Sequence, residues 1–244
     1  KRKIKIFFSV FDIKSLNVVK KLKINLIKIP SGEITNVQLL KAINKFKIKT
    51  ILSTGMSTLE EIKIAMKLLR NCKTEILHCV SEYPTNFPNL AKIKFFEKKF
   101  KKRIGFSDHT DCIITPSLAV INGAHIIEKH FTFNKSQKLG DHKMSLNPNE
   151  LKKMIKYVRI ADSAKSKIVF KRSKKELALK KLARKGIYYS ESLKAGDKLT
   201  ENSISFLRPL SNNLPAEKYH LILNKKLKRN VKALSAVSTK HFNY

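Results

Sequence analysis

The chain has 244 residues, of which 42% are hydrophobic, so it is long enough for one large domain, alone or with a small second domain. No apolar run of about 18 residues occurs, which argues against a membrane-spanning segment. The formal net charge of +34 first suggests a polyanion-binding protein, but the lysines are scattered over all segments and tryptophan is absent. We therefore expect a solvated basic surface and no specific nucleic-acid partner.

Short apolar runs alternate with helix-period segments from residue 4 to about residue 159. The runs are residues 4–9, 26–29, 50–53, 75–79, 103–106 and 125–127. Between two of them, residues 59–69 have one apolar face at helical spacing, and Ser57 with Glu60 predicts a capping box at the start of that helix. Short runs that are apolar on both faces are typical of parallel strands covered by helices. The pattern predicts an α/β fold, a TIM (β/α) barrel with six βα units, about two fewer than a closed barrel has.

The pattern changes after residue 159, which predicts three parts. We assign residues 1–162 to the partial barrel, and the lysine-rich residues 163–183 to a linker with a short helix. Residues 184–244 have short segments, a turn at 194–197 and two later prolines, so we expect a small β-rich domain there. A domain of about 60 residues is near the lower limit for independent stability, so we expect it to dock on another surface.

The three cysteines, Cys72, Cys79 and Cys112, have no metal-site spacing and leave an odd number. Free thiols are typical of a reducing compartment, so we expect a cytoplasmic protein.

Each predicted strand ends in polar or ionisable residues. They are Ser9 for the first strand, Lys28 and Ser31 to Glu33 for the second, Ser53 for the third, Ser81 to Tyr83 for the fourth, Ser107 to His109 for the fifth and Glu128 to His130 for the sixth. Because the C-terminal strand ends of a (β/α) barrel meet at one mouth, where catalytic residues lie, the sequence predicts a polar site there.

His109 and His130 follow consecutive strands, so their imidazoles can converge on one ion. Two histidines with open coordination positions suit a divalent transition metal such as Mn²⁺. We interpret His78, His125 and His142 as core or surface residues instead, because His125, for example, opens a strand and would face the other end of the barrel.

Lys28, Ser31, Ser53 and Ser107 suit a small phosphorylated anion, since lysine supplies a point charge and hydroxyls supply directed donors. Any one of these serines also fits ordinary turn chemistry. Lys28 is less easily explained that way, because a lysine inside an apolar run needs a partner. Glu33 is placed for proton transfer or for holding a sugar, and is equally compatible with a solvated loop carboxylate.

Five strings at these strand ends resemble the N-acetylneuraminate (sialic acid) synthase family, which includes the legionaminate and pseudaminate synthases. They are IPSGE (29–33), ILSTGM (51–56), HCVSEYPT (78–85), GFSDHT (105–110) and IEKHFT (127–132). Residues 184–244 resemble the antifreeze-like (SAF, β-clip-like) domain of that family through SLKAGDKLT (192–200) and LRP (207–209).

The resemblance implies a transferase that condenses phosphoenolpyruvate with an N-acetylated hexosamine, N-acetylmannosamine or a 2,4-diacetamido analogue, to a nonulosonic acid and releases phosphate. It implies metal ligation by His109 and His130, with Mn²⁺ first and Mg²⁺ or Co²⁺ as alternatives. It also implies a domain-exchanged homodimer. The implied phosphoenolpyruvate contacts are Ser9, Lys28, Ser31, Ser53, Ser81 and Ser107. The implied sugar-side residues are Glu33, which also handles protons, Tyr83, Asp141 and Arg208 from the partner subunit, with Glu128 beside the metal.

The sequence departs from the family at three places. Leu139 precedes Gly140 and Asp141 where the family has Gly-Pro-Asp, and the turn at 232–235 lacks the usual glycine. The family also has two βα units before the position that corresponds to residue 4, so the resemblance leads us to expect a barrel that lacks its first two units. Two alternatives therefore stay open: an inactive truncated remnant of such a synthase, and, favoured by charge alone, a basic polyanion-binding protein.

Overall fold

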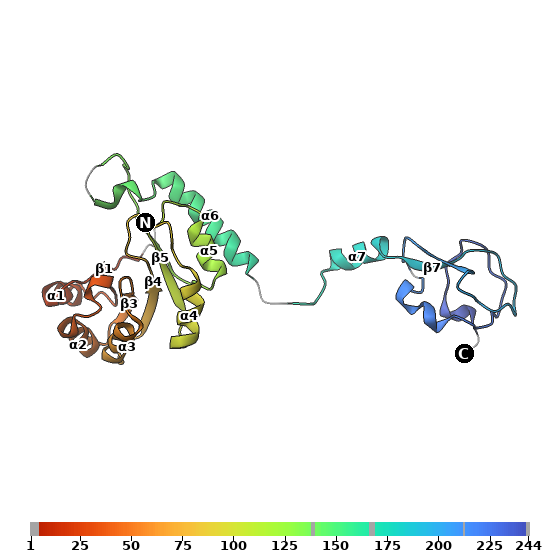
Figure 1. The fold of residues 1–244 in the computed structure, drawn as a ribbon, viewed down its shortest axis with the longest axis horizontal. Coiled ribbons are helices and arrows are strands. Elements are labelled where there is room, and N and C mark those ends of the chain that lie inside the picture. The colour runs from red at the N-terminus through yellow and green to blue at the C-terminus, as the bar shows by residue number, and fades with distance from the viewer. Residues whose placement is uncertain (1–4, 138–139, 166–168, 212, 243–244) are drawn as a thin grey trace. The chain divides into compact units, whose positions relative to one another are not determined.

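The computed structural model describes residues 5–137, 140–165, 169–211 and 213–242. It separates into two compact units, residues 1–167 and 168–244 (Figure 1). Each unit has its own hydrophobic core. Leu139 and residue 4, which the sequence singled out, lie outside the described residues.

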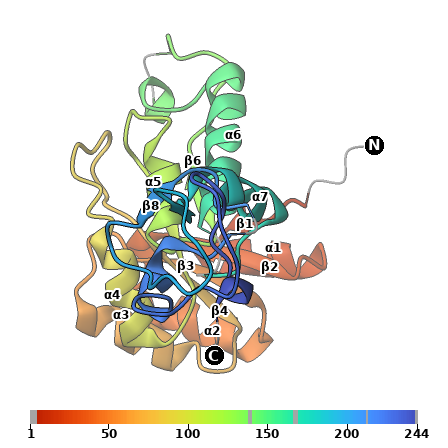
Figure 2. The ribbon, with the colours of Figure 1, turned by 90° about the vertical axis from the view of Figure 1, so that its right-hand side faces the viewer.

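The first unit contains one parallel sheet in which the strands follow their order in the chain. The strands are β1 (Phe8–Ser9), β2 (Leu26–Ile29), β3 (Lys49–Ser53), β4 (Thr74–His78), β5 (Ile104–Asp108) and β6 (Ile127–Lys129). The helices that follow them in turn are α1 (Ile13–Lys21), α2 (Val37–Phe46), α3 (Leu59–Leu68), α4 (Ala91–Phe100), α5 (Thr115–Ile121) and α6 (Pro148–Ala164) (Figures 1 and 2). This arrangement confirms the predicted α/β fold, as an open half-barrel of six strands.

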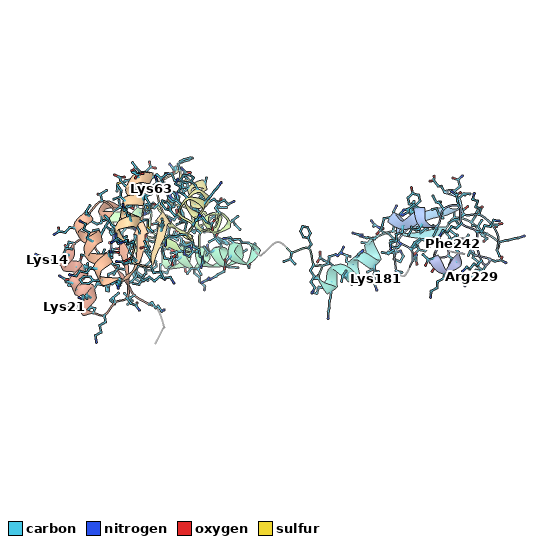
Figure 3. The ribbon with its side chains drawn as sticks, turned by 90° about the horizontal axis from the view of Figure 1, so that it is seen from below. Lys14, Lys21, Lys63, Lys181, Arg229 and Phe242 are labelled. Carbon is cyan, nitrogen blue, oxygen red and sulfur yellow. The ribbon has the colours of Figure 1, made fainter. Side chains whose placement is uncertain are left out.

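The core of the first unit lies between the sheet and its helices. Leu16 of α1, Ile27 and Leu52 of the sheet, and Ile43 and Ile62 of α2 and α3 are all fully or almost fully buried. The lysines lie on the opposite helix faces: Figure 3 shows Lys14 and Lys21 on α1 and Lys63 on α3 projecting outward, as a solvated basic surface requires.

The capping box of α3 lies one residue later than predicted. The N-cap is Thr58, whose side chain accepts from the backbone N–H of Glu61, while the Glu61 carboxylate accepts from the backbone N–H of Thr58. Ser57 instead donates its hydroxyl hydrogen to the carbonyl of Gly55 at 3.1 Å. The prediction of Ser57 and Glu60 was wrong because the segment contains two overlapping Ser/Thr-x-x-Glu patterns, and only the backbone direction after β3 selects one.

The second unit begins with α7 (Lys174–Ala183) and contains the antiparallel strands β7 (Gly186–Tyr189) and β8 (Ile204–Leu207). Isolated bridges join further segments, such as Leu193 to Val231, around a core that includes Tyr189 and Phe242. The turn that lacks a glycine places Leu234 at a φ of 59°, the left-handed region that a glycine adopts more easily. None of the described helices is both long and apolar enough to cross a bilayer.

Candidate functional site

A cavity of about 300 Å³ lies at the C-terminal ends of the strands in the first unit. It collects predicted site residues from every strand of the sheet: Ser9, Lys28, Ser31, Ser53, Ser81, Tyr83, Ser107, His109, Glu128 and His130. These side chains share the cavity because parallel strands end at the same edge and alternate residues of a strand point to the same face. Ser107 and His109 are two residues apart, as are Glu128 and His130, and all four face the cavity.

An ion pair spans the inside of the sheet. The Nζ atom of Lys28 on β2 lies 2.7 Å from Oε1 of Glu128 on β6, and the same carboxylate oxygen accepts a hydrogen bond from the Ser107 hydroxyl at 2.6 Å. Strands β2 and β6 are not neighbours in the sheet, so this contact requires the sheet to curve round the cavity. Lys28, which needed a partner inside its apolar run, finds it in Glu128.

Small hydroxyl and thiol side chains form one wall of the cavity around Gly55. The Ser31 hydroxyl oxygen accepts from the backbone N–H of Gly55 at 2.9 Å and lies 3.3 Å from the sulfur of Cys79. A Cβ atom at Gly55 would lie 2.1 Å from the hydroxyl of Ser81, so glycine is what permits this close approach. Burial raises the pKa of the Cys79 thiol, so Cys79 lines the cavity as an uncharged thiol at neutral pH.

Ser53 has an unsatisfied hydroxyl in this cavity. Its residue is 2% exposed and lines the cavity, and its Oγ has no hydrogen-bond partner among the described residues. Buried polar atoms in proteins are nearly always hydrogen-bonded, so an orphan hydroxyl that faces a cavity indicates a ligand that would bond to it.

His109 and His130 lie together, with ring centroids 5.4 Å apart, and the ring of Tyr83 lies 4.3 Å from that of His109. The Nδ1 atom of His109 lies 2.6 Å from the carbonyl oxygen of Val80, so Nδ1–H donates and Nε2 keeps its lone pair. Burial lowers the pKa of both histidines, and the neighbouring His109 lowers that of His130 further. Both rings are therefore neutral at pH 7, which is the form that ligates a metal.

These two histidines fit a divalent metal with open coordination positions. In the part of the chain that the structure describes, no group of three or more His, Cys, Asp or Glu side chains could hold an ion. A metal held by two imidazoles takes water or substrate oxygens at its other positions. The bond from His109 Nδ1–H to the Val80 carbonyl fixes the orientation of the ring, as such bonds do for metal-ligating imidazoles.

Three predicted site residues do not line this cavity. Glu33 lies in the 3₁₀ turn Ser31–Glu33, and its carboxylate accepts from the side-chain amide of Asn36 at 2.7 Å. Oδ2 of Asp141 lies 3.5 Å from Nδ1 of His130, and Asp141 lines a second cavity of about 550 Å³. The second cavity adjoins the first, because Tyr83 lines both of them. Arg208 is exposed and follows β8 in the second unit.

The sequence interpretation missed Cys79, Met56 and Phe11, which also line the cavity. Cys79 follows directly after β4, so the rule that found the serines could have found it, whereas the cysteine spacing predicted only a free thiol. The other histidines of this unit do not line the cavity. His78 bonds to the carbonyl of Pro88, and His125 bonds to Glu75 at 2.8 Å beside the beginning of β6.

The fold and the cavity define a class of protein: an α/β half-barrel with a lysine, several hydroxyls and an imidazole pair in a cavity at its C-terminal strand ends. Residues 1–169 match the model of the NeuB family, and residues 184–243 match that of the SAF domain. The chain therefore belongs to the NeuB family, as its motifs predicted.

Several known proteins are similar to this chain. The N,N'-diacetyllegionaminic acid synthase of Campylobacter jejuni is 38% identical over 91% of this chain and 68% of its own length. The pseudaminic acid synthase of the same species is 35% identical over 93% of this chain and 67% of its own length. The N-acetylneuraminic acid synthetase of Leptospira borgpetersenii, solved with citrate, superposes with a TM-score of 0.66 at 32% identity, over 70% of this chain and 61% of that one. The chain thus spans about two thirds of the length of these relatives.

Proposed function

We propose that this protein is a nonulosonic acid synthase that condenses phosphoenolpyruvate with an open-chain N-acetylated hexosamine. Carbon 3 of phosphoenolpyruvate forms a bond to the aldehyde carbon of the sugar, water adds at carbon 2, and phosphate leaves as its C–O bond breaks. The observation that carries the proposal is the orphan hydroxyl of Ser53 in a cavity that also holds Lys28 and the two histidines.

We assign the residues of the cavity three roles: supplying positive charge, orienting the substrate and holding a metal. Lys28 supplies the positive charge for the phosphate or carboxylate of phosphoenolpyruvate, and the hydroxyls direct it: Ser9, Ser31, Ser53, Ser81 and Ser107. His109 and His130 would hold a divalent metal, Mn²⁺ in the first instance and otherwise Mg²⁺ or Co²⁺, which supplies Lewis-acid polarisation of the aldehyde oxygen.

The adjoining cavity is the proposed place of the sugar. Tyr83 lines both cavities and Asp141 lies close to His130, so a sugar there would present its aldehyde to the histidine pair. Glu128 holds Lys28 and Ser107 in place. We propose Glu33 as the group that transfers protons to or from the substrate. This role would require its carboxylate to break the hydrogen bond from the Asn36 side chain.

We further propose a domain-exchanged homodimer in which Arg208 of the partner subunit binds the N-acetyl group and helps to exclude water. The exposure of Arg208 and the small core of the second unit support this arrangement. The free cysteines support a reducing compartment, and we place the enzyme in the cytoplasm.

One observation favours the second candidate, an inactive remnant. Among the described residues, β1 and β6 pair with other strands on one side only, and apolar side chains near both edges are exposed: Phe8 by 44% and Phe133 by 85%. Unpaired edges with exposed apolar groups favour aggregation or require further polypeptide to cover them.

A phosphate-release assay tests both candidates. It compares N-acetylmannosamine with a 2,4-diacetamido hexose, with and without Mn²⁺, on the 244-residue chain and on a version extended by two N-terminal βα units. We expect phosphate release from phosphoenolpyruvate only by the extended form. His109→Ala should lower the rate at least about a hundredfold, because the loss of a metal ligand or of a general acid–base group slows a reaction by about that factor or more. The exposed His220 supplies the control, His220→Ala, which should retain full activity.

One result would contradict the role of the histidine pair, and another would contradict the remnant. Turnover by the extended His109→Ala variant would remove the histidine pair from the mechanism. Turnover by the 244-residue chain would contradict the remnant and show that the open sheet suffices.

A further inference from the structure

The residues directly before the two histidines form a buried ion pair. Asp108 precedes His109 and Lys129 precedes His130, and the two are directly opposite each other in the register of β5 and β6. The Nζ atom of Lys129 lies 2.8 Å from Oδ2 of Asp108, and the side chains are 2% and 0% exposed. Because side chains alternate along a strand, the pair lies on the face of the sheet away from the cavity.

The pair also holds the loop that begins at His109. The second carboxylate oxygen of Asp108, Oδ1, accepts from the backbone N–H of Thr110 at 2.9 Å. Lys129 donates a further hydrogen bond to the carbonyl of the same residue, Thr110. Lys129 therefore contacts the residue before His109 and the residue after it, and Lys129 is itself the residue before His130.

We propose that the Asp108–Lys129 pair is a positioning element that sets the separation and orientation of His109 and His130 for a shared divalent cation. This inference rests on the proposed function. Taking two charges out of water is costly, and a buried pair often adds little stability compared with apolar residues of similar size. What the pair does supply is geometry: two directed contacts link the strand ends that carry the two imidazoles, and a third ties Asp108 to Thr110 at the end of β5.

The proposal predicts a selective loss of metal affinity. In the double variant Asp108→Asn/Lys129→Met both charges are removed together, so neither is left buried alone, and the fold should persist. We expect its dissociation constant for Mn²⁺ to rise about 10- to 100-fold, the range seen when contacts behind metal ligands are removed. Affinity for inorganic phosphate should stay within about twofold, because Lys28 and the serines are untouched.

The measurement is titration of the 244-residue chain with Mn²⁺, followed by the electron paramagnetic resonance signal of the free ion, beside phosphate calorimetry and thermal unfolding. Glu75→Gln is the matched control. It removes the charge from a different, partly buried contact, between Glu75 and His125, that lies away from the cavity, so Mn²⁺ affinity should not change.

The outcomes separate this inference from the proposed function. A folded double variant with parental Mn²⁺ affinity overturns the positioning role, and so does a parallel loss of phosphate affinity, which would indicate general damage. If the double variant does not fold, Asp108→Asn/Lys129→Gln, which also removes both charges and fills the position of Lys129 with a polar side chain, carries the same expectation and the same refutation. A parent chain that binds phosphate but no Mn²⁺ contradicts the proposed metal site itself, and this inference with it.

Discussion

Gly55 is the residue at which the wall of the cavity is most crowded. The position of its missing Cβ lies 2.1 Å from the Ser81 hydroxyl, 2.9 Å from the Cys79 sulfur and 3.0 Å from the Ser31 hydroxyl. The positions of these three side chains, which line the proposed anion site, therefore require that residue 55 has no Cβ atom.

Gly55→Ala should weaken anion binding. The added methyl group must displace Ser81 or the backbone of the loop, and overpacking of this kind costs about 1–3 kcal/mol. We expect the affinity for inorganic phosphate to fall about tenfold, measured by calorimetry, with a lower unfolding temperature. Gly105→Ala is the control, because a Cβ at Gly105 would be similarly crowded, 2.3 Å from the Leu77 side chain, but Gly105 does not line the cavity. Equal phosphate affinity in the two variants would contradict the role assigned to Gly55.

At the scale of the element, helix α3 begins with the Thr58 capping box and not with Ser57. Thr58→Ala removes the acceptor for the N–H of Glu61, so the helix start should lose about 1 kcal/mol of stability. Ser57→Ala removes only the bond to the Gly55 carbonyl and should have a smaller effect. Hydrogen exchange of α3 peptides in increasing urea measures both. A larger loss of α3 stability in Ser57→Ala than in Thr58→Ala would show that Ser57 is the N-cap, as the sequence pattern predicted.

At the scale of the whole molecule, each unit has its own core, and the second contains a buried histidine that is sensitive to pH. Nε2 of His241 lies 2.6 Å from Nη2 of Arg229, and Nδ1 lies 3.0 Å from the hydroxyl of Tyr189. Arginine can only donate, so Nε2 accepts and Nδ1–H donates to Tyr189. Burial first, and the charge of Arg229 second, lower the pKa of His241, while burial raises the pKa of Tyr189 to about 12.

The second unit should lose stability in mild acid. Because the folded His241 binds its proton less readily than the unfolded one, the unfolded chain takes up more protons as the pH falls below about 6.5, and the free energy of unfolding decreases. Hydrogen exchange of peptides from the second unit at pH 7.5 and pH 5.5 should show this loss. It should be smaller in His241→Gln and unchanged in His220→Gln, whose parent side chain is exposed. The same pH dependence in both variants would show that another group is responsible.

The sequence by itself determined the order of strands and helices and the edge at which the polar residues meet. That inference was possible because successive βα units always bring their C-terminal strand ends to one side, so Lys28, Ser53, His109 and His130 could be placed near one another without coordinates. Glu33 shows the limit of this rule. It follows β2 as Ser31 does, yet the 3₁₀ turn brings its carboxylate to Asn36 instead.

Only the tertiary structure decided which side chains form pairs. Lys28 and Glu128 are 100 positions apart on strands that do not pair, and they meet because the sheet curves. Asp108 and Lys129 pair because their register places them opposite each other on the buried face. Strand order follows from local chain geometry, whereas curvature and register depend on the packing of all the helices and strands together, and no short segment of sequence contains that information.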